Sequence, residues 1–275
     1  MRKAQRSGMV YMMNNINYDN RAKELFNTAI LAGELLAKYG AETYRVEETM
    51  IRILSLASNG RGEAMATLTG FSVSFNNTKY GYINAVRRIS DRRQRFDKII
   101  LVNEISRKLC NGEIALSEAH KKLEEINKEK DKIKGHYVAM ALVCLSFAIM
   151  FGGGWQDALM AAIAGATSAV ALVLLAKNDT GTFLSDIVAA FFIAIVAYIG
   201  NFVGFSDYSM DITIIGGIMP LVPGVAITNA LFDTLHGDYL SGVTRGLEAL
   251  VVALGIALGI FLGLGLCEGL GGGIL

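Results

Sequence analysis

Long apolar runs in the second half of the sequence limit most strongly what this chain can fold into. They cover residues 137–151, 158–176, 187–205, 212–235 and 247–267, with short polar segments between them. A helix needs about 20 apolar residues to cross the hydrocarbon core of a bilayer. The pattern therefore predicts five transmembrane helices. The first run is short, and we expect His136 and residues 152–155, which include the only tryptophan, to complete it at the interface.

Charged residues are concentrated before the first apolar run. Residues 1–136 contain 24 Lys/Arg and 16 Asp/Glu, whereas residues 137–275 contain two basic and nine acidic residues. Lys177 and Arg245, the two basic residues, lie in the second and fourth polar segments. Because basic loops stay in the cytoplasm, this predicts a multi-pass protein of the cell membrane with a cytoplasmic N-terminus. Five spans then place the C-terminus, with Glu268, outside.

The first half is predicted to be a cytoplasmic α+β domain at residues 20–134, after a disordered segment at 1–19 and before a transmembrane domain at 135–275. Apolar residues at helical spacing between 20 and 58 predict two consecutive helices, or one kinked at Gly40. The remaining elements are a β-hairpin of Met65–Phe75 and Tyr80–Arg88, followed by helices at 94–109 and 117–133. Asn111-Gly112 is the expected turn between these two helices.

The fourth apolar run contains both prolines of the chain, Pro220 and Pro223, followed by Gly224. Proline removes a backbone donor and clashes with the preceding helical turn, so this stretch should kink or unwind the helix. One interpretation is a kink that only shapes packing. The other is a broken helix whose free carbonyls and helix ends form a substrate site, as in many transporters.

Polar residues follow this break. Asn229 and Asp233 lie one helical turn apart, with Asp238 and the pair Arg245/Glu248 close behind. Ionisable groups at membrane depth are costly, so an acid here could face a cavity and bind a substrate ammonium or carry a proton. The alternative is that these residues are interfacial charges with ordinary partners. Residues Gly255, Gly259 and Gly263, spaced by four, predict a close-packing face on the fifth span, for an internal helix or a partner.

Other functional classes receive little support from the sequence. Three cysteines without CxxC spacing and three scattered histidines predict neither a disulfide framework nor a metal site, and no catalytic residues or cofactor are predicted. The basic run at 87–98 suits anionic lipid headgroups or solvent better than nucleic acid. Residues 40–49 gather carboxylates, an arginine and hydroxyls, but no catalytic order accompanies them.

Two stretches resemble the signatures of the threonine/serine exporter family. Residues 40–47, Gly-Ala-Glu-Thr-Tyr-Arg-Val-Glu, look like its N-terminal signature. Residues 217–224, together with Gly237-Asp238, Ser241-Gly242 and Glu248, look like its membrane signature. The resemblance extends over nearly the whole chain from about residue 20. It is closest to a shorter, split form that carries the N-terminal half of the fused transporter.

The resemblance implies a function and a set of site residues. The expected function is proton-driven, antiporter-type efflux of threonine or serine, with dicarboxylate (succinate) export as an alternative and a membrane-anchored, hydrolase-like enzyme as the rival class. Fused relatives carry a second group of spans, so a second small multi-span subunit is expected as partner in a hetero-oligomer, with a homo-oligomer as the alternative. The cytoplasmic signature residues are Gly40, Glu42, Thr43, Arg45 and Glu47. The substrate-pathway residues are Gly217, Pro220, Pro223, Gly224, Asn229, Asp233, Asp238, Arg245 and Glu248.

Overall fold

The computed structural model describes residues 20–57, 60–77, 81–129, 135–176, 181–203 and 207–271. The predicted disorder of residues 1–19 lies outside this part of the chain. The chain divides into two compact units. The first contains residues up to 131 together with 228–245, and the second contains residues 132–227 together with 246–275.

Two helices open the first unit, as the apolar spacing predicts. Helix α1 spans Asn20–Lys38 and α2 spans Thr43–Leu54. Gly40 separates them at φ +85°, a left-handed conformation that glycine adopts without the steric cost of a Cβ atom. The N–H of Ala41 donates to the carbonyl of Leu36 at 3.0 Å, which closes the end of α1.

The strand region contains a three-stranded sheet rather than the predicted hairpin. Strands β1 (Gly60–Thr67), β2 (Gly70–Asn77) and β3 (Gly81–Arg88) form an antiparallel meander in the order β1-β2-β3. A tight turn at Leu68-Thr69 divides the stretch that was expected to be one strand, and Thr67 pairs with Gly70 across it. Phe71, Val73 and Phe75 are buried and alternate with exposed or partly exposed serines, so one face of the sheet packs on the helices.

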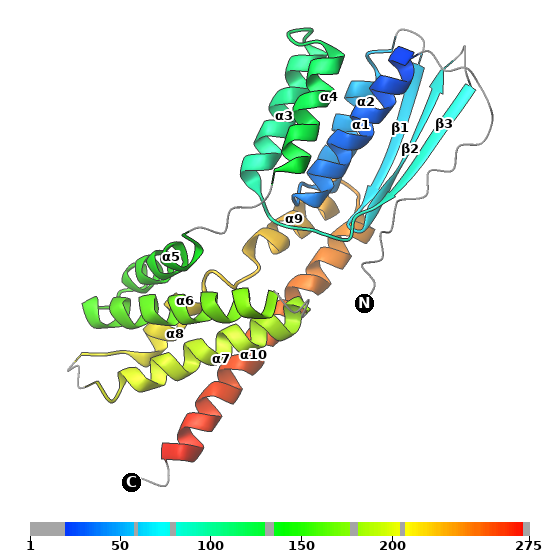
Figure 1. Ribbon diagram of the computed structural model, residues 1–275. Coiled ribbons are helices and arrows are strands. Elements are labelled where there is room, and N and C mark those ends of the chain that lie inside the picture. The colour runs from blue at the N-terminus through cyan, green and yellow to red at the C-terminus, as the bar shows by residue number, and fades with distance from the viewer. Residues whose placement is uncertain are drawn as a thin grey trace, which may run out of the picture. The chain divides into compact units, whose positions relative to one another are not determined.

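Helices α3 (Phe96–Cys110) and α4 (Leu116–Lys128) complete the α+β domain, and the turn between them contains Gly112 at φ +75° as expected. Helices α1 and α2 lie between the sheet and the α3–α4 pair (Figure 1). The core of this unit is formed by aliphatic and aromatic side chains of all three layers. Its fully buried members include Leu35, Leu36, Val46, Met50, Ile53, Leu54, Val73, Phe75, Val102 and Leu123.

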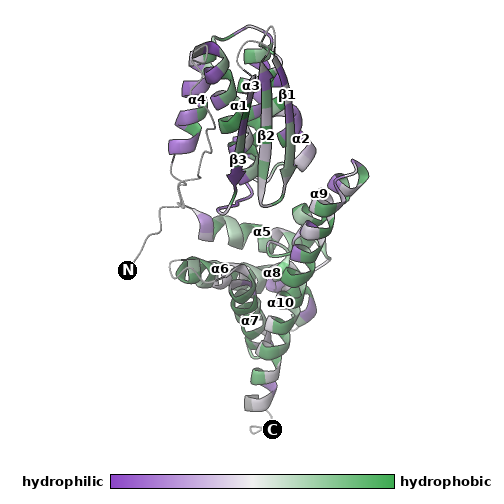
Figure 2. Ribbon diagram, turned by 90° about the vertical axis from the view of Figure 1, so that its right-hand side faces the viewer, coloured by the Kyte–Doolittle hydropathy of each residue, from purple (hydrophilic) through white to green (hydrophobic). Residues whose placement is uncertain are grey.

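The second unit is helical and apolar. It contains α5 (His136–Met150), α6 (Trp155–Ala176), α7 (Thr182–Gly200), α8 (Met210–Ile218), the start of α9 (Gly224–Leu235) and most of α10 (Tyr239–Gly271). Within the described residues, α6, α7 and α10 are long and apolar enough to cross a membrane, and α5 is a shorter apolar helix. Apolar residues surround these helices on nearly every side, in contrast to the polar surface of α4 (Figure 2).

The predicted break in the fourth apolar run is confirmed. Helix α8 ends at Ile218 and α9 begins at Gly224, so residues 219–223 with both prolines are not helical. Neither piece is long enough to span a bilayer alone. Upstream of the break, Gly216 and Gly217 let α8 pack closely on its neighbours. A Cβ atom at Gly216 would lie 2.9 Å from Ala148 of α5, and one at Gly217 would lie 2.7 Å from Ile193 of α7.

The glycine face of the last helix packs on α7. A Cβ atom at Gly259 would come within 2.2 Å of the Ile187 carbonyl oxygen, and one at Gly263 within 2.7 Å of Ala194. At Gly255 the nearest atom, from Phe183, is 3.2 Å away. The small-residue face therefore serves contact with an internal helix, the first of the two uses expected for it.

Candidate functional site

Asp233 is the centre of a polar cluster in the first unit. Its side chain is fully buried, and one carboxylate oxygen accepts a hydrogen bond from the backbone N–H of Thr43 at 3.0 Å. Thr43 is the first residue of α2, and the preceding residue, Glu42, provides no side-chain cap. The first N–H groups of a helix have no partner inside the helix, and the helix dipole favours negative charge there. Asp233 therefore caps α2 from a position 190 residues later in the sequence.

Arg245 neutralises the buried carboxylate. Its Nε donates to the second oxygen of Asp233 at 2.8 Å, and its Nη2 donates to the carbonyl oxygen of Ala41 at 2.9 Å. The Arg245 side chain is 10% exposed and that of Asp233 is 0% exposed. A buried ion pair is retained at low cost only when its remaining donors and acceptors are satisfied. Here the carbonyl oxygen of Ala41 accepts from Arg245, and the N–H of Thr43 donates to Asp233.

Asn229, one turn before Asp233, contacts the same corner. Its side-chain amide donates to the carbonyl oxygen of Gly40 at 3.2 Å, and the residue is 7% exposed. The left-handed backbone at Gly40 ends α1. The carbonyls of Gly40 and Ala41 then face Asn229 and Arg245, which donate to them. A Cβ atom at Gly40 would also lie 2.3 Å from Oε1 of Gln94. Glycine at this position is therefore required both by φ and by space.

A tight helical hairpin carries Asp233 and Arg245. Helix α9 ends in a turn with Gly237 at φ +90°, where the N–H of Asp238 donates to the carbonyl of Asp233 at 2.8 Å. Helix α10 then returns along α9. A Cβ atom at Gly242 would lie 2.2 Å from Oγ1 of Thr234 and 2.9 Å from the carbonyl oxygen of Ala230, so only glycine allows this approach. We call residues 228–245 the docking hairpin.

Two further carboxyl groups lie near the cluster. Glu47, on α2, accepts a hydrogen bond from the N–H of Ala66 at 2.6 Å. Burial raises the pKa of Glu47, and the Ala66 N–H opposes this, while the charges of Asp238 and Asp233 raise the pKa further. Burial also raises the pKa of Asp238, Asp233 adds to that increase, and His236 opposes it. Both groups therefore bind a proton more readily than free carboxylates do.

The exposed side of the same corner has other contacts. The rings of Tyr44 and His236 stack at a centroid distance of 4.2 Å with an interplanar angle of 4°, and Arg45 pairs with Glu42 at 2.9 Å.

Thr43 is 2% exposed, and its hydroxyl oxygen has no hydrogen-bond partner within the described residues. The hydroxyl is therefore a buried polar group, beside the Asp233 carboxylate, that is available to another hydrogen-bonding partner.

The matching family model is described as "Putative threonine/serine exporter" and covers residues 27–267. The chain belongs to this family. The curated "Threonine/serine exporter" of Corynebacterium glutamicum is 26% identical over 163 residues, which are 57% of this chain and 33% of that relative. The matched region thus covers about a third of the relative. No solved structure matches this chain.

The two segments that resemble signatures of the threonine/serine exporter family meet in the structure. Gly40 and Thr43 from the N-terminal signature bind Asn229 and Asp233, while Glu47 lies within electrostatic range of Asp238. Gly237, Asp238 and Gly242 shape the docking hairpin. Asn229 and Asp233 are 189 and 190 positions away in the sequence from the residues that they bind, Gly40 and Thr43. Their sequence patterns are visible separately, but only the fold pairs them.

Other expected pathway residues lie in the second unit. Gly217, Pro220, Pro223 and Gly224 form the end of α8 and the break, and Glu248 follows on α10. Gly217 is buried, and its carbonyl oxygen accepts a hydrogen bond from Sγ of Cys144 at 3.4 Å.

Sequence patterns missed several residues of functional interest. Ala41 contributes only a backbone carbonyl, for which no side-chain signal exists. Asp157, 2% exposed in the second unit, accepts hydrogen bonds from the N–H groups of Gly154 and Ser209 at 2.8 and 2.7 Å. An acid in the first turn of an apolar helix was the available signal for it. Within the described residues, no group of three His, Cys, Asp or Glu side chains could hold a metal ion.

Proposed function

We propose that this protein is a membrane exporter, or an exporter subunit, of small polar metabolites, with threonine and serine as its first substrates. Membership of the threonine/serine exporter family supports export rather than catalysis. The structural observation that carries the proposal is the capping of α2 by Asp233. Three hydrogen bonds to the backbone of residues 40, 41 and 43 join the docking hairpin to the cytoplasmic domain, directly after a proline-broken apolar segment. Inside the hairpin, the buried ion pair of Asp233 and Arg245 holds two of these three side chains together.

In this proposal the docking hairpin connects the cytoplasmic domain to the helix break. Helix α9 begins at Gly224, immediately after the break, and its later residues belong to the first unit. Broken helices supply transporters with free carbonyls and helix termini near the substrate. Docking and release of residues 228–245 would then alter the position of α9 relative to residues 217–224. Those residues, with Asn229, Asp233, Asp238, Arg245 and Glu248, are the proposed pathway.

A five-span topology fits the division of the chain. The chain leaves the first unit near residue 131 and returns to it at residue 228, so an even number of crossings between these points keeps that unit on one side. We propose that α5, α6, α7 and the α8–α9 segment provide four crossings, and that α10 provides the fifth. The basic residues of the first unit support a cytoplasmic location for it in this proposal.

We further propose that proton movement drives export. Glu47 and Asp238 have raised pKa values and lie within electrostatic range of Asp233, the carboxylate that binds the start of α2. Protonation of either group reduces the repulsion between carboxylates around Asp233. A change of pH can therefore shift the balance between docked and released hairpin, as a coupling device requires.

Flux measurement in vesicles tests the proposal. Cells or inverted vesicles containing the full chain, alone and with candidate small multi-span subunits, are loaded with labelled threonine, serine or succinate under an imposed pH gradient. Gradient-dependent movement of threonine or serine supports the proposal. Movement of succinate alone would replace the substrate class with dicarboxylates, and transport by the purified single chain would remove the need for a second subunit.

The rival enzyme hypothesis has its own test. It places catalysis in the Glu42, Arg45 and Glu47 cluster of the cytoplasmic domain. If turnover of a small metabolite by the purified protein is abolished by Glu47→Gln while vesicle flux is absent, the exporter proposal is wrong.

A further inference from the structure

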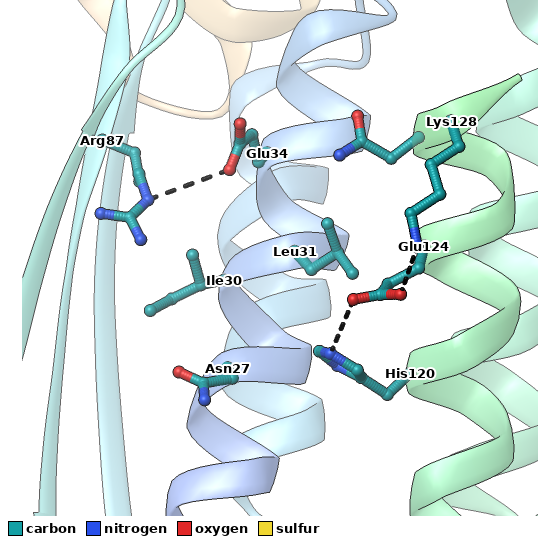
Figure 3. A pocket seen from close by; sticks show the side chains of 9 residues that line it. Asn27, Ile30, Leu31, Glu34, Arg87, His120, Glu124 and Lys128 are labelled. Atoms are coloured by element: carbon teal, nitrogen blue, oxygen red, sulfur yellow. Dashed lines mark hydrogen bonds and ion pairs between the residues drawn. The ribbon is translucent and has the colours of Figure 1, made fainter. Parts of the chain in front are cut away.

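A pocket in the cytoplasmic domain lies apart from the Asp233 cluster. Its volume is about 280 Å³, and no residue of the docking hairpin lines it. Helix α1 provides the floor, strand β3 one wall and helix α4 the other (Figure 3). We call it the α1–α4 pocket. It is lined by Asn27, Ile30, Leu31, Glu34, Arg87, His120, Glu124, Asn127 and Lys128.

Arg87 offers an unsatisfied donor on the β3 side. Its Nε lies 3.9 Å from Oε2 of Glu34, which is beyond hydrogen-bond distance. Its Nη1 is buried and has no hydrogen-bond partner within the described residues. The Arg87 side chain as a whole is 22% exposed, and a guanidinium group can bind a carboxylate through two parallel hydrogen bonds. Glu34, the long-range ion-pair partner of Arg87, is 42% exposed and can also accept from an ammonium group.

His120 and Glu124 offer acceptors on the α4 side. The hydroxyl of Thr28 donates to the carbonyl of Glu24 at 2.7 Å and lies 3.1 Å from Nδ1 of His120. Because that hydroxyl has one hydrogen, Nδ1 of His120 must be the donor in the second contact. The neutral ring then has an acceptor at Nε2, which lies 3.8 Å from Oε1 of Glu124. Two acceptors at this distance suit a hydrogen-bond donor from a ligand.

The side chains between these two polar sides are apolar. Ile30 and Leu31 lie between Arg87–Glu34 and His120–Glu124 in Figure 3. An adjacent carboxylate and ammonium match Arg87 and Glu34, a small aliphatic group matches Ile30 and Leu31, and a hydroxyl donor matches His120 and Glu124. We propose that the α1–α4 pocket binds a small α-amino acid whose side chain ends in a hydroxyl group.

This pocket is separate from the transport pathway, and its use for sensing the cytoplasmic concentration of the exported amino acid rests on the proposed function. Binding itself does not depend on export. A dicarboxylate fits less well because it has no donor for Glu34 or for the acceptors of His120 and Glu124. N-acetylation of the ligand removes the ammonium group that Glu34 recognises.

Titration calorimetry of the full chain in nanodiscs tests this assignment with L-threonine, L-valine, N-acetyl-L-threonine and succinate. Valine has nearly the shape of threonine without the hydroxyl group. We expect threonine to bind about tenfold or more tightly than the other three, because each of them lacks a donor that Glu34, His120 or Glu124 would bind. Hydrogen exchange should decrease on adding threonine in residues 27–34 and 120–128, which locates the bound ligand in this pocket.

Arg87→Met should weaken threonine binding by about tenfold or more. Arg88→Met is the matched control, since Arg88 is the next residue of β3 and is exposed on the opposite face of the sheet. Leu31→Trp fills the pocket without removing a charge and should also abolish binding. Thermal unfolding of each variant shows whether the fold is retained.

Several results would overturn the assignment: absence of threonine binding, equal binding of valine, tighter binding of succinate, or unchanged affinity in both Arg87→Met and Leu31→Trp. Flux is measured on the same protein variants reconstituted in sealed vesicles. Flux without threonine binding at this pocket would refute the sensing site and leave the exporter proposal intact. Threonine binding at this pocket without flux of any substrate would support the binding site and refute the exporter proposal.

Discussion

The carboxylate of Asp233 accepts a hydrogen bond from the backbone N–H of Thr43 at 3.0 Å, and this contact joins the two signature segments of the chain. It gives the start of α2 the negative partner that its dipole favours. It also fixes the docking hairpin on the first unit. The strength of this one contact therefore bears on both the stability of the domain and the movement proposed for α9.

Asp233→Asn tests the contact directly. The amide retains an acceptor for Thr43 but leaves the buried guanidinium of Arg245 without a counter-charge. Removing one partner of a buried pair costs about 3–5 kcal/mol, so we expect a lower unfolding temperature and loss of export with the protein still present in the membrane. Asp211→Asn is the control, because Asp211 is exposed at the start of α8. Wild-type flux in the Asp233 variant would show that the pair has no part in transport.

A double-mutant cycle separates the pair from its surroundings. Arg245→Met alone leaves Asp233 charged and buried, and also removes the donor to Ala41. The double variant Asp233→Asn/Arg245→Met buries no charge, so its loss of stability should be smaller than the sum of the two single losses by about 1–3 kcal/mol. Unfolding of the four proteins in one detergent gives this coupling energy. Additive losses would mean that Asp233 and Arg245 contribute little to stability through their interaction with each other.

Gly40→Ala tests the corner that receives the hairpin. The substitution places a Cβ atom at φ +85° and 2.3 Å from Oε1 of Gln94. Gly112→Ala provides the control, because that residue has φ +75° with no atom within 4 Å of the added Cβ. Both variants carry a backbone strain of about 1–2 kcal/mol, because both residues have positive φ. Only Gly40→Ala should lose more stability than this. Adding Gln94→Ala should recover the difference, and failure to recover it would place the cost elsewhere.

The helices and the break were predictable from the sequence, because both depend on local patterns. Apolar spacing located α1 to α4, and Pro220 and Pro223 located the interruption before α9. The turn at Leu68-Thr69 was missed, because neither residue is typical of a two-residue hairpin and Leu68 is buried. The extra strand explains why Gly70 is needed: a Cβ atom there would lie 2.4 Å from the Arg87 carbonyl oxygen on β3.

The candidate site was predictable only in part, for a physical reason. Asn229 and Asp233 were placed on one helical face, and the structure confirms that both side chains contact the same corner. Their partners are backbone groups of residues 40, 41 and 43. Backbone donors and acceptors have no residue-specific pattern, so no spacing in the sequence could identify this pairing. Their role in the transport pathway stays a prediction.

Protonation of Glu47 should strengthen the folded first unit. Its pKa is raised above the usual 4.5, so the folded protein binds this proton more tightly than the unfolded chain does. The linked stability is fully present below pH 4.5 and decreases as the pH rises through the raised value. Glu47→Gln keeps an acceptor for Ala66 and should flatten this part of the pH profile of thermal unfolding. An unchanged profile would assign the dependence to Asp238, whose pKa is raised in the same direction.

Gly259→Leu tests the packing of α10 on α7. The added side chain would start 2.2 Å from the Ile187 carbonyl oxygen and 2.8 Å from Cβ of Ala190, so the two helices must separate. Membrane helices associate largely through such close contacts, and overpacking typically costs about 1–3 kcal/mol. Gly265→Leu adds the same side chain to the same helix where no atom lies within 4 Å of the new Cβ. We expect a lower unfolding temperature and reduced flux for the first variant and wild-type behaviour for the second. Equal stability of the two variants would mean that the α7–α10 contact does not hold the second unit together.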